Sequence, residues 1–154
     1  MHPTPSRRQF LGLIAATPVF AGLATQALAG QDPVFQKKGL AIGGYDPVAY
    51  FTERKPVRGS ADFTSTWNGA TFRFASAENK SLFDGAPEAY APQYGGYCAY
   101  AVSQGYTAKT DPDAWSVEGD KLYLNFSKRV RRIWLKDVPG HIAAGDKNWP
   151  DVLG

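Results

Sequence analysis

The fold is decided by the stretch Asn68-Gly69-Ala70-Thr71-Phe72-Arg73-Phe74-Ala75-Ser76. Its Asn-Gly pair supplies the left-handed backbone of a two-residue hairpin turn. The strand that follows alternates, so Phe72 and Phe74 share one face, which we expect to be buried. Ser76 stands where a helix N-cap would stand, because its hydroxyl can accept a hydrogen bond from the first helical turn. The stretch therefore predicts the second strand of a β-hairpin followed directly by a helix.

The residues on either side complete this unit. Residues 62–67 alternate in the strand sense and provide the first strand of the hairpin. The helix after the hairpin carries Phe83, and a second helical turn begins at Pro87. Upstream, Asp46 is placed to cap a short helix whose first position is Pro47, where the missing N–H costs nothing.

The C-terminal half is also predicted to contain a hairpin and helices. A second hairpin is predicted from residues 114–117 and 121–126, and a capped helix follows it. Pro139-Gly140 is expected to break that helix before a last helix that ends near Trp149. Hairpins and helices alternate without a strand–helix–strand repeat. The predicted fold class is therefore α+β, with small antiparallel hairpin sheets packed against short helices in a single domain.

Residues 1–29 are predicted to be a twin-arginine signal peptide that is cleaved. They contain Ser6-Arg7-Arg8-Gln9-Phe10-Leu11, then an uncharged stretch, and end in Ala27-Leu28-Ala29, which a signal peptidase can cleave. The alternative is a membrane anchor, which the weak hydrophobicity of the stretch disfavours. We expect residues 30–154 to be the mature periplasmic chain. Its partner in export is the twin-arginine machinery, and it meets the membrane only during export.

The charge of the mature chain argues against nucleic acid as a partner. The full chain has 17 Lys and Arg against 14 Asp and Glu. Removing Arg7 and Arg8 leaves 15 basic residues against the same 14 acidic ones, a net charge of +1. Binding to nucleic acid needs a basic face. The basic cluster at 128–132 is interpreted as the solvated face of a helix.

The first hairpin and the helices after it resemble the YHS domain, over about residues 62–95. The residues that carry the resemblance are Asn68–Ser76, Phe83 and Pro87-Glu88-Ala89-Tyr90. The whole chain is also similar to a group of exported bacterial YHS-domain proteins, through residues 44–51 and 93–99. Many YHS and related domains bind metal through cysteines at the strand–helix junction, so the resemblance implies an association with metal.

This chain departs from the family at that junction, where it has Ala75 and Asn79. Alanine cannot bind a metal, so a retained metal site would have to lie in the segment around Cys98. That segment fits a short helix or a buried strand equally well. The cysteine is the only one in the chain, which excludes an intramolecular disulfide and the four-ligand Cys/His sites of structural zinc modules.

We hypothesise that Cys98 and His141 are metal ligands, supplemented by oxygen atoms. Copper, another transition metal or a haem-like iron is compatible with such mixed ligands, and the cofactor is left open. Tyr94, Tyr97 and Tyr100 are the predicted ligand-binding residues, because they place hydroxyl groups beside apolar rings. The alternatives are a small thiol buried among rings and a histidine with a surface or capping role.

Three functions follow from these residues. The first is a periplasmic YHS-domain binding or carrier protein for a metal ion or small cofactor held near Cys98. The second is an accessory module without a bound ligand, which docks to another periplasmic protein through an exposed apolar patch. The third is a thiol-based redox enzyme, which needs an exposed thiolate beside a positive charge. We favour the first, and with it a protein that is not an enzyme.

Overall fold

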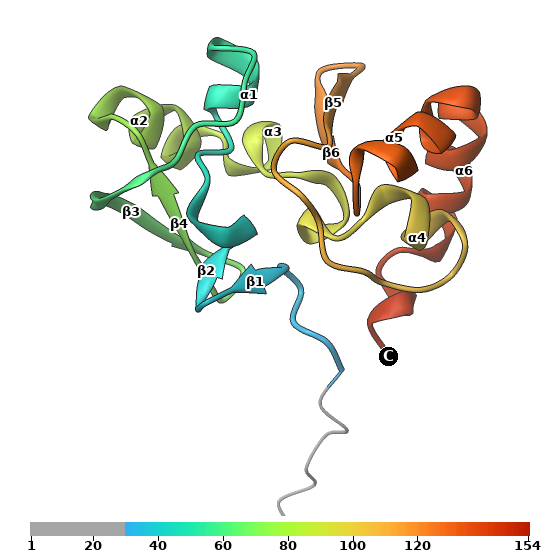
Figure 1. Cartoon of the computed structure of the whole chain (residues 1–154). Helices are drawn as coiled ribbons and strands as arrows, with labels where there is room; N and C mark the ends of the chain where they lie inside the picture. The colour runs from blue at the N-terminus through green and yellow to red at the C-terminus, as the bar shows by residue number, and fades with distance from the viewer. Residues whose placement is uncertain (1–29) are drawn as a thin grey trace, which may run out of the picture.

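The computed structural model describes residues 30–154, so the predicted signal peptide at 1–29 lies outside the described residues. Within the described part, the strands pair as three separate antiparallel hairpins with helices between and after them (Figure 1). The strands are β1 (Gln36–Lys37), β2 (Leu40–Ala41), β3 (Ser60–Trp67), β4 (Ala70–Phe74), β5 (Trp115–Glu118) and β6 (Lys121–Leu124). The α-helices are α1 (Ala49–Thr52), α2 (Ala77–Gly85), α3 (Pro87–Tyr90), α4 (Ala99–Ser103), α5 (Lys128–Trp134) and α6 (Val138–Asn148). The 3-10 helices are η1 (Ile42–Gly44), η2 (Gln93–Gly96), η3 (Leu135–Asp137) and η4 (Asp151–Leu153). The predicted α+β class is confirmed.

The hairpin of β3 and β4 has the predicted turn and face. Asn68 and Gly69 both have positive φ, at 47° and 76°, and the register places Trp67 opposite Ala70. Phe72 and Phe74 are fully buried. The rings of both pack against Phe83 of α2, with centroid separations of 5.0 Å. This aromatic cluster is the core of the N-terminal half.

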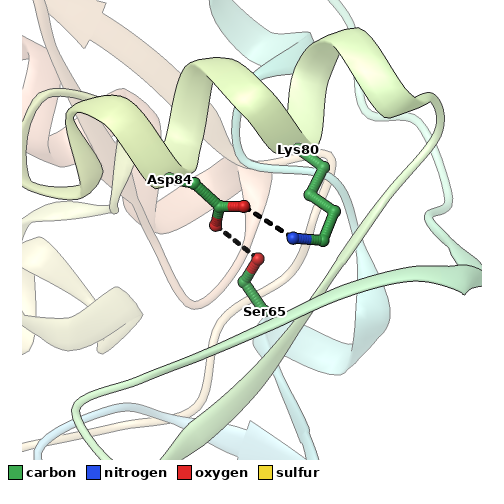
Figure 2. A network of polar contacts seen from close by, with 3 residues as sticks. All are labelled: Ser65, Lys80 and Asp84. Atoms are coloured by element: carbon green, nitrogen blue, oxygen red, sulfur yellow. Dashed lines mark hydrogen bonds and ion pairs between the residues drawn. The ribbon is translucent and has the colours of Figure 1, made fainter.

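Helix α2 begins where Ser76 predicts, and it is tied to the hairpin at its far end. The Ser76 hydroxyl accepts a hydrogen bond from the backbone N–H of Asn79 at 3.1 Å. Near the end of the helix, the Asp84 carboxylate accepts from the Ser65 hydroxyl at 2.5 Å and from the Lys80 ammonium at 2.6 Å (Figure 2). These two bonds hold the pKa of Asp84 below its usual value. The network is exposed to solvent, so its contribution to stability is small.

The C-terminal half contains β5, β6 and the helices α4 to α6 (yellow to red in Figure 1). The segment after Cys98 is a helix, α4, which settles the choice between helix and strand. Helix α5 ends at Trp134, and Asp137 caps α6 by accepting from the N–H of Gly140. The expectation that Pro139-Gly140 breaks the helix is wrong, since both residues lie in the first turn of α6. Proline is tolerated there because that N–H has no partner within the helix.

One short hairpin was not predicted from the sequence. Strands β1 and β2 are joined by Lys38 and Gly39, both with positive φ. With two residues in each strand, the hairpin is too short to show alternation of apolar and polar side chains.

The two halves of the chain meet in a shared core, where Ile42 and Tyr50 pack with Leu122 and Leu124 of β6. Among residues 30–154, no helix has the length and apolar character needed to span a membrane.

Candidate functional site

The carboxylate of Asp46 is fully buried and lies at the junction between β4 and α2. Its Oδ1 accepts from the N–H groups of Val48 and Ala49, at 2.8 and 3.3 Å, where the chain enters α1. The helix begins at Ala49 and not at Pro47 as predicted, so Asp46 lies before the residue that precedes the helix. Its Oδ2 accepts from the N–H of Ala75 at 2.8 Å and from the side-chain amide of Asn79 at 2.7 Å. Ala75 and Asn79 stand where the family resemblance implies cysteines. In this protein both donate hydrogen bonds to the buried carboxylate of Asp46.

Cys98 is buried, with 1 % of its surface exposed. Its Sγ accepts from the backbone N–H of Phe126 at 3.2 Å and lies 3.5 Å from Oδ1 of Asn125. That same Oδ1 accepts from the N–H of Tyr100 at 3.0 Å, so Asn125 fixes the start of α4. Burial raises the pKa of the Cys98 thiol, and backbone N–H groups offset only part of the rise. The thiol is thus held in its neutral form within the core.

His141 lies against a different set of residues. Its Nδ1 is 3.2 Å from the Ser103 hydroxyl, and its ring contacts the Tyr100 ring edge-on at 5.3 Å between centroids. The Ser103 hydroxyl donates to the carbonyl oxygen of Tyr100 at 2.6 Å, so Nδ1 of His141 is the donor in its contact with Ser103. The histidine joins α6 to α4, and its contacts do not include Cys98.

Cys98 and His141 have separate sets of contacts within the described residues. A transition-metal site needs several donor side chains that converge on one point. Within residues 30–154, no three His, Cys, Asp or Glu side chains are grouped so that they could hold a metal ion. The contacts of both residues support structural roles, and their assignment as metal ligands stays a prediction from sequence.

We expect Cys98 to react with an aromatic disulfide reagent roughly a hundredfold more slowly in the folded protein than in urea, because the buried thiol must first be exposed by local opening. Stopped-flow absorbance measures both rates. Since the raised pKa suppresses thiolate, the folded rate should also rise little between neutral pH and about pH 8.5. Equal rates in the folded and unfolded chain would show that the thiol is accessible, and would restore the redox-enzyme hypothesis.

A cleft of about 820 Å³ lies between the β3–β4 turn, η2 and the C-terminal segment. Three aromatic side chains line it: Trp67, Tyr94 and Trp149. Three charged side chains also line it: Glu88, Lys121 and Asp146. The lining also includes three prolines, whose rings provide rigid apolar surface: Pro33, Pro92 and Pro150. Rings, charges and rigid apolar groups together are typical of a site for a small organic molecule.

Tyr94 is the residue that connects the cleft to the rest of the fold. Its backbone is left-handed, with φ 57°, a conformation that non-glycine residues rarely adopt. Its hydroxyl donates to Oδ1 of Asp146 at 2.9 Å, and its ring lies 6.1 Å from that of Trp149. A Cβ on Gly145 would lie 2.6 Å from the hydroxyl oxygen, so only glycine leaves room for it. Strained backbone of this kind often marks a binding site.

The other two tyrosines predicted to bind a ligand do not line the cleft. Tyr97 donates its hydroxyl to the carbonyl oxygen of Asp32 at 2.8 Å and packs on Trp149 from within the core. Tyr100 packs on His141. The fold therefore brings Tyr94 and Tyr97 to the same tryptophan, while Tyr100 belongs to the contact between α4 and α6.

Comparison with known proteins gives one family. The model of the YHS domain matches residues 48–94. The chain contains a YHS domain. No curated protein and no solved structure matches the chain. The match ends at Tyr94, so the cleft lies where the YHS domain meets the C-terminal segment.

The sequence did not point to most of the cleft. Trp67 precedes the hairpin turn and Trp149 follows α6, so their proximity depends on the tertiary fold. Glu88, Lys121 and Asp146 are exposed charged residues without a motif. The one local signal was Tyr94 before Gly95-Gly96, where glycines allow unusual backbone beside an aromatic side chain.

We expect the free energy of unfolding to fall as the pH rises above about 10, the ordinary pKa of tyrosine. Burial, and then the Asp146 carboxylate that accepts its hydroxyl, raise the pKa of Tyr94 in the folded state. The stabilisation from neutral Tyr94 is thus complete below the unfolded pKa and is lost as the pH rises toward the folded pKa. Urea denaturation at several pH values measures this slope. Tyr94→Phe should make the free energy of unfolding depend less steeply on pH. Tyr106→Phe, at an exposed position, should leave that dependence unchanged. Equal slopes in the wild type and both variants would show that Tyr94 is not a source of the pH dependence.

Proposed function

We propose that this protein is an exported binding protein that holds a small amine-bearing zwitterion in the cleft at the end of its YHS domain. One observation carries the proposal: three aromatic side chains and two carboxylates line a single cavity. The predicted signal peptide supports a periplasmic location, and the proposal keeps the carrier function inferred from the sequence. It moves the ligand from Cys98 to the cleft around Tyr94.

The aromatic side chains favour a cationic group. The faces of Trp and Tyr rings attract ammonium groups, most strongly when the cation carries methyl groups and is weakly hydrated. Trp67 and Trp149 line the cavity and are partly exposed, so their rings are the ones available to a cation. Tyr94 is only 4 % exposed, and its ring packs on that of Trp149 and supports it.

The charged side chains favour a zwitterion over a simple cation. Glu88 and Asp146 place negative charge beside the rings, which adds Coulomb attraction for an ammonium group. Lys121 can receive a carboxylate at the other end of the ligand. A compact betaine-like or amino-acid-like molecule satisfies both requirements.

Calorimetric titration of the mature chain with glycine betaine tests the proposal. We expect saturable binding in the wild type, weakened roughly tenfold or more in the double variant Glu88→Gln/Asp146→Asn. Glu53→Gln removes an exposed acidic charge outside the cleft and should leave the affinity unchanged. Absence of saturable binding of glycine betaine and of choline, or an equal loss in all variants, would contradict the proposal.

The docking function stays a prediction. It requires an exposed apolar patch. The large apolar side chains that are exposed come from α2, the loop after α4, the segment after β6, α5 and η3. They are Leu82, Tyr106, Phe126, Ile133 and Leu135.

A further inference from the structure

A second cavity, of about 360 Å³, is lined by basic side chains. It lies among the β1–β2 hairpin, η1 and β4. Its basic residues are Lys37, Lys38, Arg58 and Arg73, and no acidic side chain lines it. Within residues 30–154, none of the four forms an ion pair. Four uncompensated positive charges around one small cavity create a local potential that attracts anions.

Arg73 carries the strongest evidence. It lies on β4 between Phe72 and Phe74, whose rings face the core, so its side chain extends from the opposite face. Its Nε is buried and has no hydrogen-bond partner among the described residues. A buried donor without a partner is rare in folded proteins. An anion in the cavity would provide the missing acceptor.

The neighbouring residues position the other groups. The guanidinium of Arg58 lies over the ring of Tyr45, 5.0 Å from its centroid, which restricts its orientation. Gly44 has φ 85°, and a Cβ there would lie 3.0 Å from the Leu40 side chain and 3.8 Å from Cδ of Arg73. The glycine therefore leaves room beside Arg73.

We propose that this cavity binds a small polyvalent oxyanion of the phosphate class, independently of the amine cleft. Guanidinium groups form paired hydrogen bonds with phosphate oxygens, and lysines add charge without a fixed geometry. Asp111 and Asp113 flank the lining residue Pro112 in sequence, but neither lines the cavity, so the site keeps its excess of positive charge.

Pyrophosphate is the probe for this proposal, with citrate as a polycarboxylate comparison. Calorimetry on the mature chain at low salt should show saturable binding of pyrophosphate, weakened roughly tenfold by Arg73→Gln and by Arg58→Gln. Arg132→Gln removes the same charge from the exposed part of α5 and should have no such effect. Thermal unfolding checks that each variant is folded. Arg58 is exposed, so its variant keeps the test valid if Arg73→Gln does not fold.

Three results would overturn the proposal. The first is no saturable binding of pyrophosphate to the wild type. The second is an equal loss in Arg58→Gln and Arg132→Gln, which would indicate attraction to net charge alone. The third is tighter binding of citrate than of pyrophosphate, which would exclude phosphate chemistry as the basis of recognition.

Discussion

Asp46→Ala is expected to lower the free energy of unfolding by roughly 3–5 kcal/mol, enough to leave much of the chain unfolded. The carboxylate is fully buried and accepts four hydrogen bonds, two from the backbone where the chain enters α1 and two from the junction of β4 and α2. Alanine leaves several of these donors buried without partners, and each such donor costs about 1–3 kcal/mol. Urea denaturation followed by circular dichroism measures the loss.

The exposed carboxylate of Asp84 provides the matched control. It also accepts two hydrogen bonds, but from solvent-exposed side chains (Figure 2), so Asp84→Ala should cost about 0.5 kcal/mol or less. Asp46→Asn adds a second test, because its amide would face the donors at Ala75 and Asn79 and should cost nearly as much as alanine. A loss for Asp46→Ala no greater than that for Asp84→Ala would show that the junction does not depend on this carboxylate.

Gly95→Ala is expected to cost roughly 3 kcal/mol and to disturb the cleft. Gly95 has φ 62°, and a Cβ would collide with the carbonyl oxygen of Pro33 and lie 3.2 Å from Cα of Val34. The same glycine accepts a hydrogen bond from the N–H of Phe35 at 2.9 Å, so the two backbone segments cannot separate without losing it. Since Tyr94 precedes Gly95, any shift moves a wall of the cleft.

Gly69→Ala separates the collision from backbone strain. Gly69 also has positive φ, at 76°, but a Cβ there would meet nothing within 4 Å. We expect a cost of about 1–2 kcal/mol, from the left-handed conformation alone. Thermal unfolding of both variants measures the difference, and equal losses would contradict the close approach of Gly95 to Pro33.

The fold could be predicted where its signals are local. Asn68-Gly69 forms a hairpin turn, and Ser76 caps the helix that begins at Ala77. Phe72 and Phe74 lie on one face of their strand because side chains alternate. Each of these features depends only on residues that are near in sequence. Asp46 was predicted only in part. Its contacts with the N-terminus of α1 are local, whereas its bonds to Ala75 and Asn79 cross about thirty residues and leave no periodic pattern.

The candidate site could be predicted far less well. A single cysteine among tyrosines draws attention because its chemistry is distinctive, but its burial depends on tertiary packing that the sequence does not display. Asn125, which accepts from the N–H of Tyr100 and orders the start of α4, is an ordinary polar residue after a strand. The cleft joins Trp67 to Trp149 through the whole fold, and only Tyr94 had a local signal in the glycines that follow it.

Binding of a small zwitterion in the cleft can be followed through the indole N–H signals of the four tryptophans in the NMR spectrum. Trp67 and Trp149 line the cleft, whereas Trp115 and Trp134 do not and serve as internal controls. On titration with glycine betaine, we expect saturable shifts of the Trp67 and Trp149 signals and unchanged signals from Trp115 and Trp134. Unchanged signals from Trp67 and Trp149, or equal shifts of all four, would contradict binding in the cleft.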